Sequence, residues 1–235
     1  MDKIALITGA TRGLGFAMSE KLATLGFNVI MACREEKTGK ISYEKLKSKN
    51  LDVYFEVCDV EKISDIDNLY KSVSKKFDHL DVLINNAGVN IEPASTKIEN
   101  IDLKLFEKIM NINLRGPLYM CSKFIPMLKK SNDARIINFA SGLAQLSVPR
   151  MGPYPSYSIS KTAVNQLTWF LAEELKNTSV KVFSVDPGWV KTDMGGPDAM
   201  LEIGEGIDTP IWLATEDAAK LKSGFFYKER KIIPW

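Results

Sequence analysis

Short apolar runs alternate along the chain with longer, more polar segments. The runs consist mainly of apolar residues and cover 3–8, 28–33, 52–57, 81–85, 135–140 and 181–186. A strand that is apolar along nearly its whole length is buried on both faces, as in a parallel sheet covered by helices. The alternation therefore predicts an α/β fold of the Rossmann type, with a doubly wound parallel sheet of about seven strands.

The segments between the runs have a helical pattern. Residues 13–25, 62–77, 103–130 and 156–175 carry apolar positions three or four residues apart, which predicts amphipathic helices on both faces of the sheet. The chain shows no repeat, low-complexity tract or linker, so we expect a single domain over residues 1–235. Two loops rich in glycine and proline follow strands, and they lie on the side where open α/β sheets bind ligands.

Composition and charge exclude several classes of function. Apolar residues make up 45% of the chain and charged residues 26%, with a net charge of +2. This balance supports a sizeable core and predicts neither a nucleic-acid nor a membrane partner. The chain has no apolar run long enough to span a membrane and begins directly with a strand pattern, so we expect a cytoplasmic location.

The candidate metal ligands are sparse. The three cysteines, Cys33, Cys58 and Cys121, are far apart and lack CxxC spacing, so we expect neither a disulfide framework nor a zinc site. Cys33 and Cys58 fall in apolar runs and are expected in the core. The only histidine, His79, stands among charged residues and is expected at the surface.

A glycine-rich turn follows the first predicted strand. In TGATRGLG, Gly9, Gly13 and Gly15 lie between that strand and a helix. Glycines allow a tight turn and close approach to a pyrophosphate, and a helix N-terminus offers free N–H groups. The alternative is a tight strand–helix turn without a ligand. Because the turn directly joins a strand to a helix, we favour a nucleotide site.

Further motifs follow in a fixed order along nearly the whole chain. After the glycine turn come Asp59, NNAG at 85–88, Asn113, Ser141, a tyrosine–lysine pair and DPGWVKT at 186–192. Together they resemble the single-domain branch of the short-chain dehydrogenase/reductase family. The segment at 186–196 and the C-terminal GFFYKERKIIPW are similar to its carbonyl-reductase branch. The resemblance implies a nicotinamide dinucleotide and hydride transfer to a carbonyl.

The residues after the second strand favour NADP(H) over NAD(H). An acid at the end of this strand binds the ribose 2′-hydroxyl of NAD. Here that position is Cys33, followed by Arg34, and Arg12 lies in the glycine turn. Two guanidinium groups can bind a 2′-phosphate, although both could instead be ordinary surface arginines.

The resemblance implies contacts along the whole dinucleotide. Asp59 and Val60 are expected at the adenine, residues 86–88 at the adenosine ribose, and the Val190 backbone and Thr192 hydroxyl at the carboxamide. Asn85 is expected to be structural. The predicted cofactor-binding residues are Gly9, Thr11, Arg12, Gly13, Leu14, Gly15, Arg34, Asp59, Val60, Asn86, Ala87, Gly88, Tyr157, Lys161, Val190 and Thr192.

Two tyrosines compete for the role of proton donor. Tyr157 precedes Lys161 by four residues, so the two share a helix face if a helix begins near Ser156. Tyr154 lies between two prolines, outside that helix. A nearby ammonium lowers the pKa of a phenol, so we assign the general acid to Tyr157. The YxxxK spacing alone also occurs between ordinary helix residues.

The resemblance implies three further roles. Lys161 also binds the nicotinamide ribose, Ser141 holds the substrate oxygen, and Asn113 holds a water behind Lys161. Asn113 could equally be a polar residue that bends a helix. The predicted catalytic residues are Asn113, Ser141, Tyr157 and Lys161.

The predicted substrate pocket is apolar, which suggests an apolar aldehyde, ketone or quinone. Its candidates, which could instead simply pack the loops, are Leu143, Met151, Tyr154, Trp189 and Met194. A 3-oxoacyl, sugar or steroid reductase is the nearest alternative, and a non-catalytic NADP-binding sensor the next. In the family that the chain resembles, some carbonyl reductases are monomers because of a long insertion before the catalytic tyrosine. The gap from Ser141 to Tyr157 has no such insertion, so the resemblance implies that the helices at 103–130 and 157–176 pair in a homo-dimer or homo-tetramer.

Overall fold

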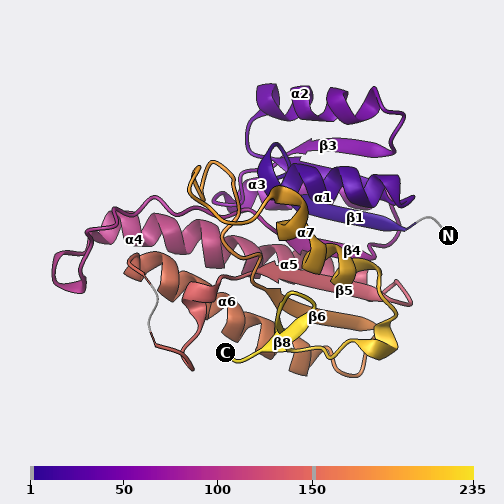
Figure 1. Ribbon diagram of the computed structural model, residues 1–235. Helices are drawn as coiled ribbons and strands as arrows, with labels where there is room; N and C mark the ends of the chain where they lie inside the picture. The colour runs from indigo at the N-terminus through magenta and orange to yellow at the C-terminus, as the bar shows by residue number, and fades with distance from the viewer. Residues whose placement is uncertain (1–2, 150–151) are drawn as a thin grey trace.

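The computed structural model describes residues 3–149 and 152–235. One eight-stranded sheet runs through them in the order β3-β2-β1-β4-β5-β6-β7-β8 (Figure 1). The strands are β1 Ile4–Thr8, β2 Asn28–Cys33, β3 Val53–Val57, β4 Val82–Asn85, β5 Ala134–Phe139, β6 Val180–Val185, β7 Phe225–Lys228 and β8 Lys231–Ile233. The predicted Rossmann-type α/β fold is confirmed.

The sheet differs from the expected seven strands at its C-terminal edge. Strands β1 to β7 pair in parallel, whereas β8 pairs antiparallel with β7. β8 has only three residues, and its first two are exposed. A short edge strand of this kind has no buried face, so it lacks the apolar run by which the other strands are recognised.

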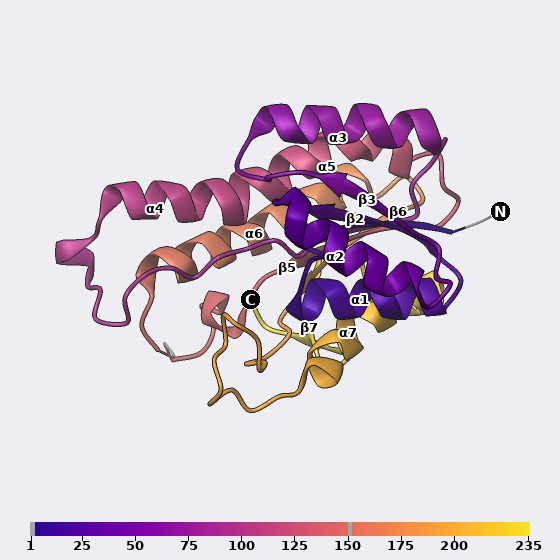
Figure 2. The ribbon, with the colours of Figure 1, turned by 90° about the horizontal axis from the view of Figure 1, so that it is seen from above.

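Helices cover both faces of the sheet (Figure 2). The helices are α1 Gly13–Thr24, α2 Glu36–Lys47, α3 Ile63–Lys76, α4 Leu103–Met110, α5 Gly116–Leu128, α6 Pro155–Glu174 and α7 Ile203–Thr215. Figure 2 shows α1 and α7 on one side of the sheet and α3 and α5 on the other. The helices predicted at 13–25, 62–77 and 156–175 are confirmed to within one residue at each end.

The strand pattern explains why the apolar runs are nearly continuous. In β1, Ile4 and Leu6 join the core that contains α3 and α5, while Ala5 and Ile7 join the core that contains α1 and α7. Because successive side chains point to opposite faces, a central strand must be apolar at every position when both faces are covered.

The helix predicted at 103–130 is continuous but contains one wider turn. α4 and α5 are joined by a π-turn, η2, at Asn111–Arg115. A π-turn inserts one wide turn into an α-helix, and such turns often occur at functional sites. It contains Asn113, which is fully buried.

The remaining expectations concern cysteines, the histidine and the membrane. All three cysteines lie within the described residues, where each is buried and none forms a disulfide. His79 is partly buried, with Nε2 3.2 Å from Asp81 Oδ2, so it is less exposed than expected. Among the described residues, no helix is long and apolar enough to cross a bilayer, and no cluster of three or more acidic, histidine or cysteine side chains is placed to hold a metal.

Candidate functional site

The glycine turn between β1 and α1 has the backbone that its sequence predicts. Gly9 and Gly13 have φ angles of 67° and 55°, which side chains with a Cβ rarely adopt. Gly15 is needed for a different reason, because a Cβ there would lie 2.2 Å from the Gly9 carbonyl oxygen. Arg12 directly precedes α1, and in the described part of the chain its side chain forms no capping hydrogen bond. The N–H groups at the helix start therefore remain available to a ligand.

The loop after β4 holds this turn in place. Asn86 Nδ2 donates to the carbonyls of Thr8 at 2.8 Å and Gly9 at 3.2 Å. In return, the Thr8 hydroxyl accepts the backbone N–H groups of Asn86 and Ala87 at 3.1 and 3.0 Å. The Asn86 side chain therefore links the loop after β4 to the glycine turn. Sequence reasoning missed Thr8, whose partners lie nearly 80 residues away.

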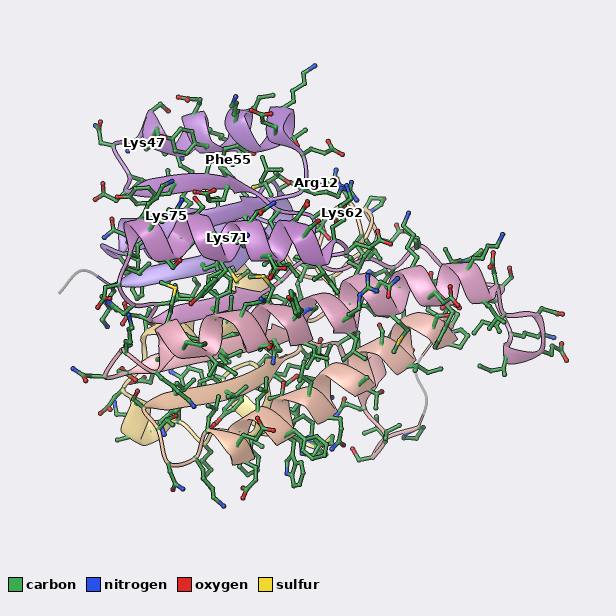
Figure 3. The ribbon with its side chains drawn as sticks, turned by 180° about the vertical axis from the view of Figure 1, so that it is seen from behind. Arg12, Lys47, Phe55, Lys62, Lys71 and Lys75 are labelled. Carbon is green, nitrogen blue, oxygen red and sulfur yellow. The ribbon has the colours of Figure 1, made fainter. Side chains whose placement is uncertain are left out.

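The two arginines lie at the rim of the site. Arg12 Nη1 is 2.7 Å from Asp193 Oδ2, and Arg34 Nη2 is 3.3 Å from Glu35 Oε1. All four side chains are exposed, so each pair contributes little stability and can be exchanged for a phosphate. Figure 3 shows Arg12 and Lys62, which precede α1 and α3, on the same side of the molecule. Cys33, at the position of the missing acid, is fully buried.

The expected adenine-side residues lie at the strand ends. Asp59 Oδ1 accepts the N–H of Glu61 at 3.1 Å, which shapes the turn after β3. Val60 is buried, and its carbonyl lies 3.0 Å from the position that a Cβ on Gly116 would take. The Thr11 carbonyl accepts the Ser42 hydroxyl at 2.7 Å. The contacts of Asp59 and Val60 with adenine, and of Thr11 with the cofactor, remain predictions.

The loop after β6 lies against the glycine turn. A Cβ on Gly13 would be 3.4 Å from Thr192 Cγ2, so Thr192 at the end of this segment packs beside the glycine turn. The Thr192 hydroxyl donates to the Val190 carbonyl at 3.3 Å and accepts the Gly195 N–H at 3.2 Å. Leu14, from the start of α1, meets the neighbouring α7 near Gly206.

Tyr157 is buried in the first turn of α6, and its phenol interacts with the Ser141 side chain at the end of β5. Burial raises the pKa of Tyr157 to about 12, the Ser141 hydrogen bond opposes this rise, and the charge of Asp186 adds to it. The phenol therefore holds its proton at neutral pH. The two residues predicted for proton donation and for substrate-oxygen binding are in direct contact.

Lys161 lies one turn further along the same helix face. Its Nζ is 5.8 Å from the centroid of the Tyr157 ring and donates to the Phe139 carbonyl at 2.7 Å. Burial lowers the pKa of Lys161 to about 8. The expected lowering of the Tyr157 pKa by Lys161 is wrong for this structure, in which burial of the phenol raises that pKa.

Asn113 uses its side chain to join the site loops. Its Oδ1 accepts the N–H of Val89 at 2.8 Å, and its Nδ2 donates to the Val89 carbonyl at 2.9 Å and to the Ser160 hydroxyl at 3.0 Å. Both amide hydrogens are therefore engaged. A Cβ on Gly88 would be 3.3 Å from both Asn113 Oδ1 and Lys161 Nζ, so this amide oxygen faces the region beside the ammonium, where the predicted water would lie.

The predicted pocket residues have different surroundings. Trp189 and Met194 are each half-exposed, and Trp189 Nε1 donates to the Gly195 carbonyl at 2.8 Å. Tyr154 precedes α6 with a φ of 74°, which places it outside the helix as predicted. Met151 lies outside the described residues.

Leu143 lies between Ser141 and a groove: its backbone N–H donates to the Ser141 hydroxyl at 3.2 Å, and the residue also borders the groove. The groove has a volume of about 720 Å³ and is lined largely by apolar side chains from η3 (Gly142–Ala144), the following loop and the outer face of α6. Ser158, Ile159 and Thr162 line it, but none of the four catalytic candidates does. On an α-helix, Ile159 and Thr162 project away from the face shared by Tyr157 and Lys161, and Ser158 lies at the edge between the two faces.

Two buried side chains at the site have no local sequence signal. Ser160 donates from its hydroxyl to the Tyr157 carbonyl at 2.7 Å. Glu92 lies between β4 and η1 (Ile98–Asn100) and bonds to the start of α6. Their partners in other elements become apparent only once the chain is folded.

Comparisons with known proteins agree with this geometry. The family model for short chain dehydrogenases matches residues 3–200. An uncharacterized oxidoreductase of Staphylococcus saprophyticus is 31% identical, with 83% of this chain and 81% of that protein covered. Carbonyl reductase [NADPH] 1 of Mus musculus is 27% identical, with coverages of 99% and 98%.

A solved structure extends the likeness to three dimensions. The NADPH-bound carbonyl reductase from chicken fatty liver superposes with a TM-score of 0.87 at 29% identity, covering 100% of this chain and 99% of that one. The family match spans most of the chain and includes both the glycine turn and the Ser141, Tyr157 and Lys161 constellation. The chain therefore belongs to the short-chain dehydrogenase/reductase family of oxidoreductases.

Proposed function

We propose that this protein reduces a carbonyl group to an alcohol with NADPH. The observation that carries the proposal is the contact between the buried Tyr157 phenol and Ser141, with Lys161 Nζ 5.8 Å from the phenol ring. These groups stand at the carboxyl ends of the parallel strands, beside the glycine turn. The named activity of the mouse relative and the NADPH bound in the chicken structure support the same assignment.

The residues present fit NADP(H). The uncapped start of α1 offers N–H groups to a pyrophosphate, and Gly15 has no room for a side chain beneath the turn. Arg12 and Arg34 are available for a 2′-phosphate at the rim, and no acid stands at the end of β2. The continuous sheet supports one cofactor-binding domain over residues 1–235.

The four catalytic candidates then divide the reaction among them. NADPH supplies the hydride to the carbonyl carbon. Tyr157 donates its phenolic proton to the developing alkoxide, and the Ser141 hydroxyl stabilises the charge on that oxygen. Lys161, held in the site by the Phe139 carbonyl, supplies positive charge and would bind the nicotinamide ribose. Asn113 positions the water through which the proton on Tyr157 is replaced.

The substrate class we propose is an apolar aldehyde, ketone or quinone. The half-exposed Trp189 and Met194 offer an apolar rim that is open to solvent. A 3-oxoacyl, sugar or steroid reductase uses the same reacting groups and is the alternative. A non-catalytic NADP-binding sensor is disfavoured because Tyr157 and Ser141 are in contact.

The test is oxidation of NADPH, followed by absorbance, against a panel of aldehydes, diketones and quinones, with NADH in parallel. Turnover that prefers NADPH supports the proposal. Tight NADPH binding without turnover on any member of a widened panel favours the sensor. A preference for NADH contradicts the arginine site but leaves the chemistry intact.

The pH dependence of reduction follows from the two buried titrating groups. Burial lowers the pKa of Lys161 to about 8 and raises that of Tyr157 to about 12, so both groups carry their protons at neutral pH. We expect kcat/KM to be flat near pH 6–7 and to fall about tenfold per pH unit well above pH 8, as Lys161 loses its charge. Full recovery on return to pH 7 excludes irreversible inactivation, and an unchanged circular dichroism spectrum at the higher pH excludes unfolding. A rate that rises through pH 8 contradicts the assignment.

We also propose that the protein is a homo-dimer or homo-tetramer that pairs through α6 and α5. The outer face of α6 exposes Ile159, Trp169 and Phe170, and α5 exposes Leu118. Apolar surface of this kind commonly marks a contact between chains. Light scattering is expected to give two or four times the mass of one chain, and Trp169→Glu to shift it toward the monomer. A monomeric wild-type protein overturns this proposal.

A further inference from the structure

Glu92 is a buried acid outside the predicted site. It lies in the loop that follows NNAG, and only 5% of its surface is exposed. Its Oε2 accepts the backbone N–H of Ser156 at 2.9 Å and that of Tyr157 at 3.4 Å, and its Oε1 accepts the Ser156 hydroxyl at 2.6 Å. A buried carboxylate is favourable only when it is hydrogen-bonded in this way.

The start of α6 needs such a partner. The helix begins at Pro155, which has no N–H group. The preceding residue, Tyr154, makes no side-chain capping hydrogen bond to the helix in the described part of the chain. The N–H groups of Ser156 and Tyr157 therefore lack local acceptors, and the helix N-terminus carries partial positive charge. Glu92 supplies the missing acceptor and a compensating negative charge from 64 residues away.

Both backbone polar groups of Tyr157 are therefore hydrogen-bonded. Its N–H meets Glu92, and its carbonyl accepts the Ser160 hydroxyl, which in turn accepts Asn113 Nδ2. Asn113 binds both backbone groups of Val89, three residues before Glu92. The loop after β4 therefore holds the first turn of α6 at two points, and the same loop contains the cofactor-binding residues 86–88.

We propose that Glu92 is a positioning residue for the reduction. Its carboxylate fixes the start of α6, and so the place of the Tyr157 phenol relative to Ser141 and to the cofactor loop. The inference rests on the proposed function, because it assigns Glu92 to the same reaction. A displacement of about 1 Å at a reacting group can cost about 100-fold in rate, so this anchor is expected to act on turnover rather than on cofactor affinity.

The test compares Glu92→Ala with Glu92→Gln. Alanine removes every acceptor, and we expect kcat to fall about 10-fold to 100-fold with the NADPH dissociation constant unchanged within about twofold. Glutamine keeps one acceptor oxygen, so a smaller loss of kcat is expected. Partial rescue by glutamine distinguishes positioning from general damage, and it keeps the test usable if the alanine variant folds poorly.

Asp102→Ala is the matched control. The Asp102 carboxylate also accepts two backbone N–H groups at a helix start, those of Lys104 and Leu105. Its loss weakens α4 by a comparable route, away from the reacting groups, and is expected to leave kcat unchanged. An equal fall in kcat in both variants overturns the proposal.

Hydrogen exchange at residues 154–162 provides a readout that needs no substrate. We expect faster exchange in Glu92→Ala than in the wild type or in Asp102→Ala. If the wild-type protein reduces no carbonyl but exchange behaves as expected, the proposed function fails while the anchor stands. Unchanged exchange, or faster exchange with wild-type kcat, overturns the positioning role.

Discussion

Replacing Tyr157 by phenylalanine is expected to lower kcat for carbonyl reduction by about 10²–10⁴-fold, the range found for a positioned general acid. The substitution removes only the hydroxyl oxygen, so the ring keeps its packing in the first turn of α6. Affinity for NADPH, measured by fluorescence titration, is expected to change little. Steady-state oxidation of NADPH with the best substrate of the panel measures the loss.

The control for this variant is Tyr119→Phe. The Tyr119 hydroxyl donates to Asp67 Oδ1 at 2.9 Å on the α3–α5 side of the sheet, so this change also deletes one phenol hydrogen bond. It is expected to retain full activity. If Tyr157→Phe keeps more than about a tenth of wild-type activity, general acid catalysis by Tyr157 is wrong, and Tyr154 becomes the residue to test.

Removing both rim arginines, as Arg12→Ala with Arg34→Ala, is expected to reverse the cofactor preference. A hydrogen bond to a charged group contributes about 1.5–3 kcal/mol, so each arginine is worth about tenfold to hundredfold in kcat/KM for NADPH. NADH has no 2′-phosphate, and its kcat/KM is expected to change little. Kinetics with both cofactors, at low and high salt, measure the change.

Two comparisons test this interpretation. Arg230→Ala removes an exposed arginine that pairs with Asp208, and it is expected to leave both cofactors unaffected. The wild-type preference for NADPH is expected to weaken with added salt, because the phosphate contact is exposed and screened. A similar loss with NADPH and NADH in the double variant contradicts a phosphate site at the arginines.

Much of the fold and of the catalytic pair could be predicted from local sequence patterns. The apolar runs predict the buried parallel strands because a strand covered on both faces is apolar at successive positions. The pairing of Tyr157 with Lys161 follows from the spacing of four on one helix. The glycine turn is also local, since Gly9 and Gly13 need φ angles that other residues rarely adopt.

Other features could not be predicted because they depend on long-range packing. The pKa of Tyr157 rises to about 12 because the folded chain buries the phenol, although the spacing to Lys161 predicted a fall. The π-turn at Asn111–Arg115 interrupts a segment with an unbroken helical pattern. The short edge strand β8 carries no buried run and is recognised only by its pairing with β7.

The sequence by itself determined the family, and it predicted the order of the site motifs along the chain and Tyr157 as the general acid, because these depend on neighbouring residues and short spacings. Only the tertiary structure decided how the acid is held. Glu92 and Val89, from the loop after β4, and Asn113, from η2, are all far from Tyr157 in the chain. Once the sheet brings these elements together, Glu92 bonds Tyr157 directly, and Asn113 links Val89 to it through Ser160. Burial of these polar groups then makes their hydrogen bonds necessary, since an unpaired polar group in the core is costly.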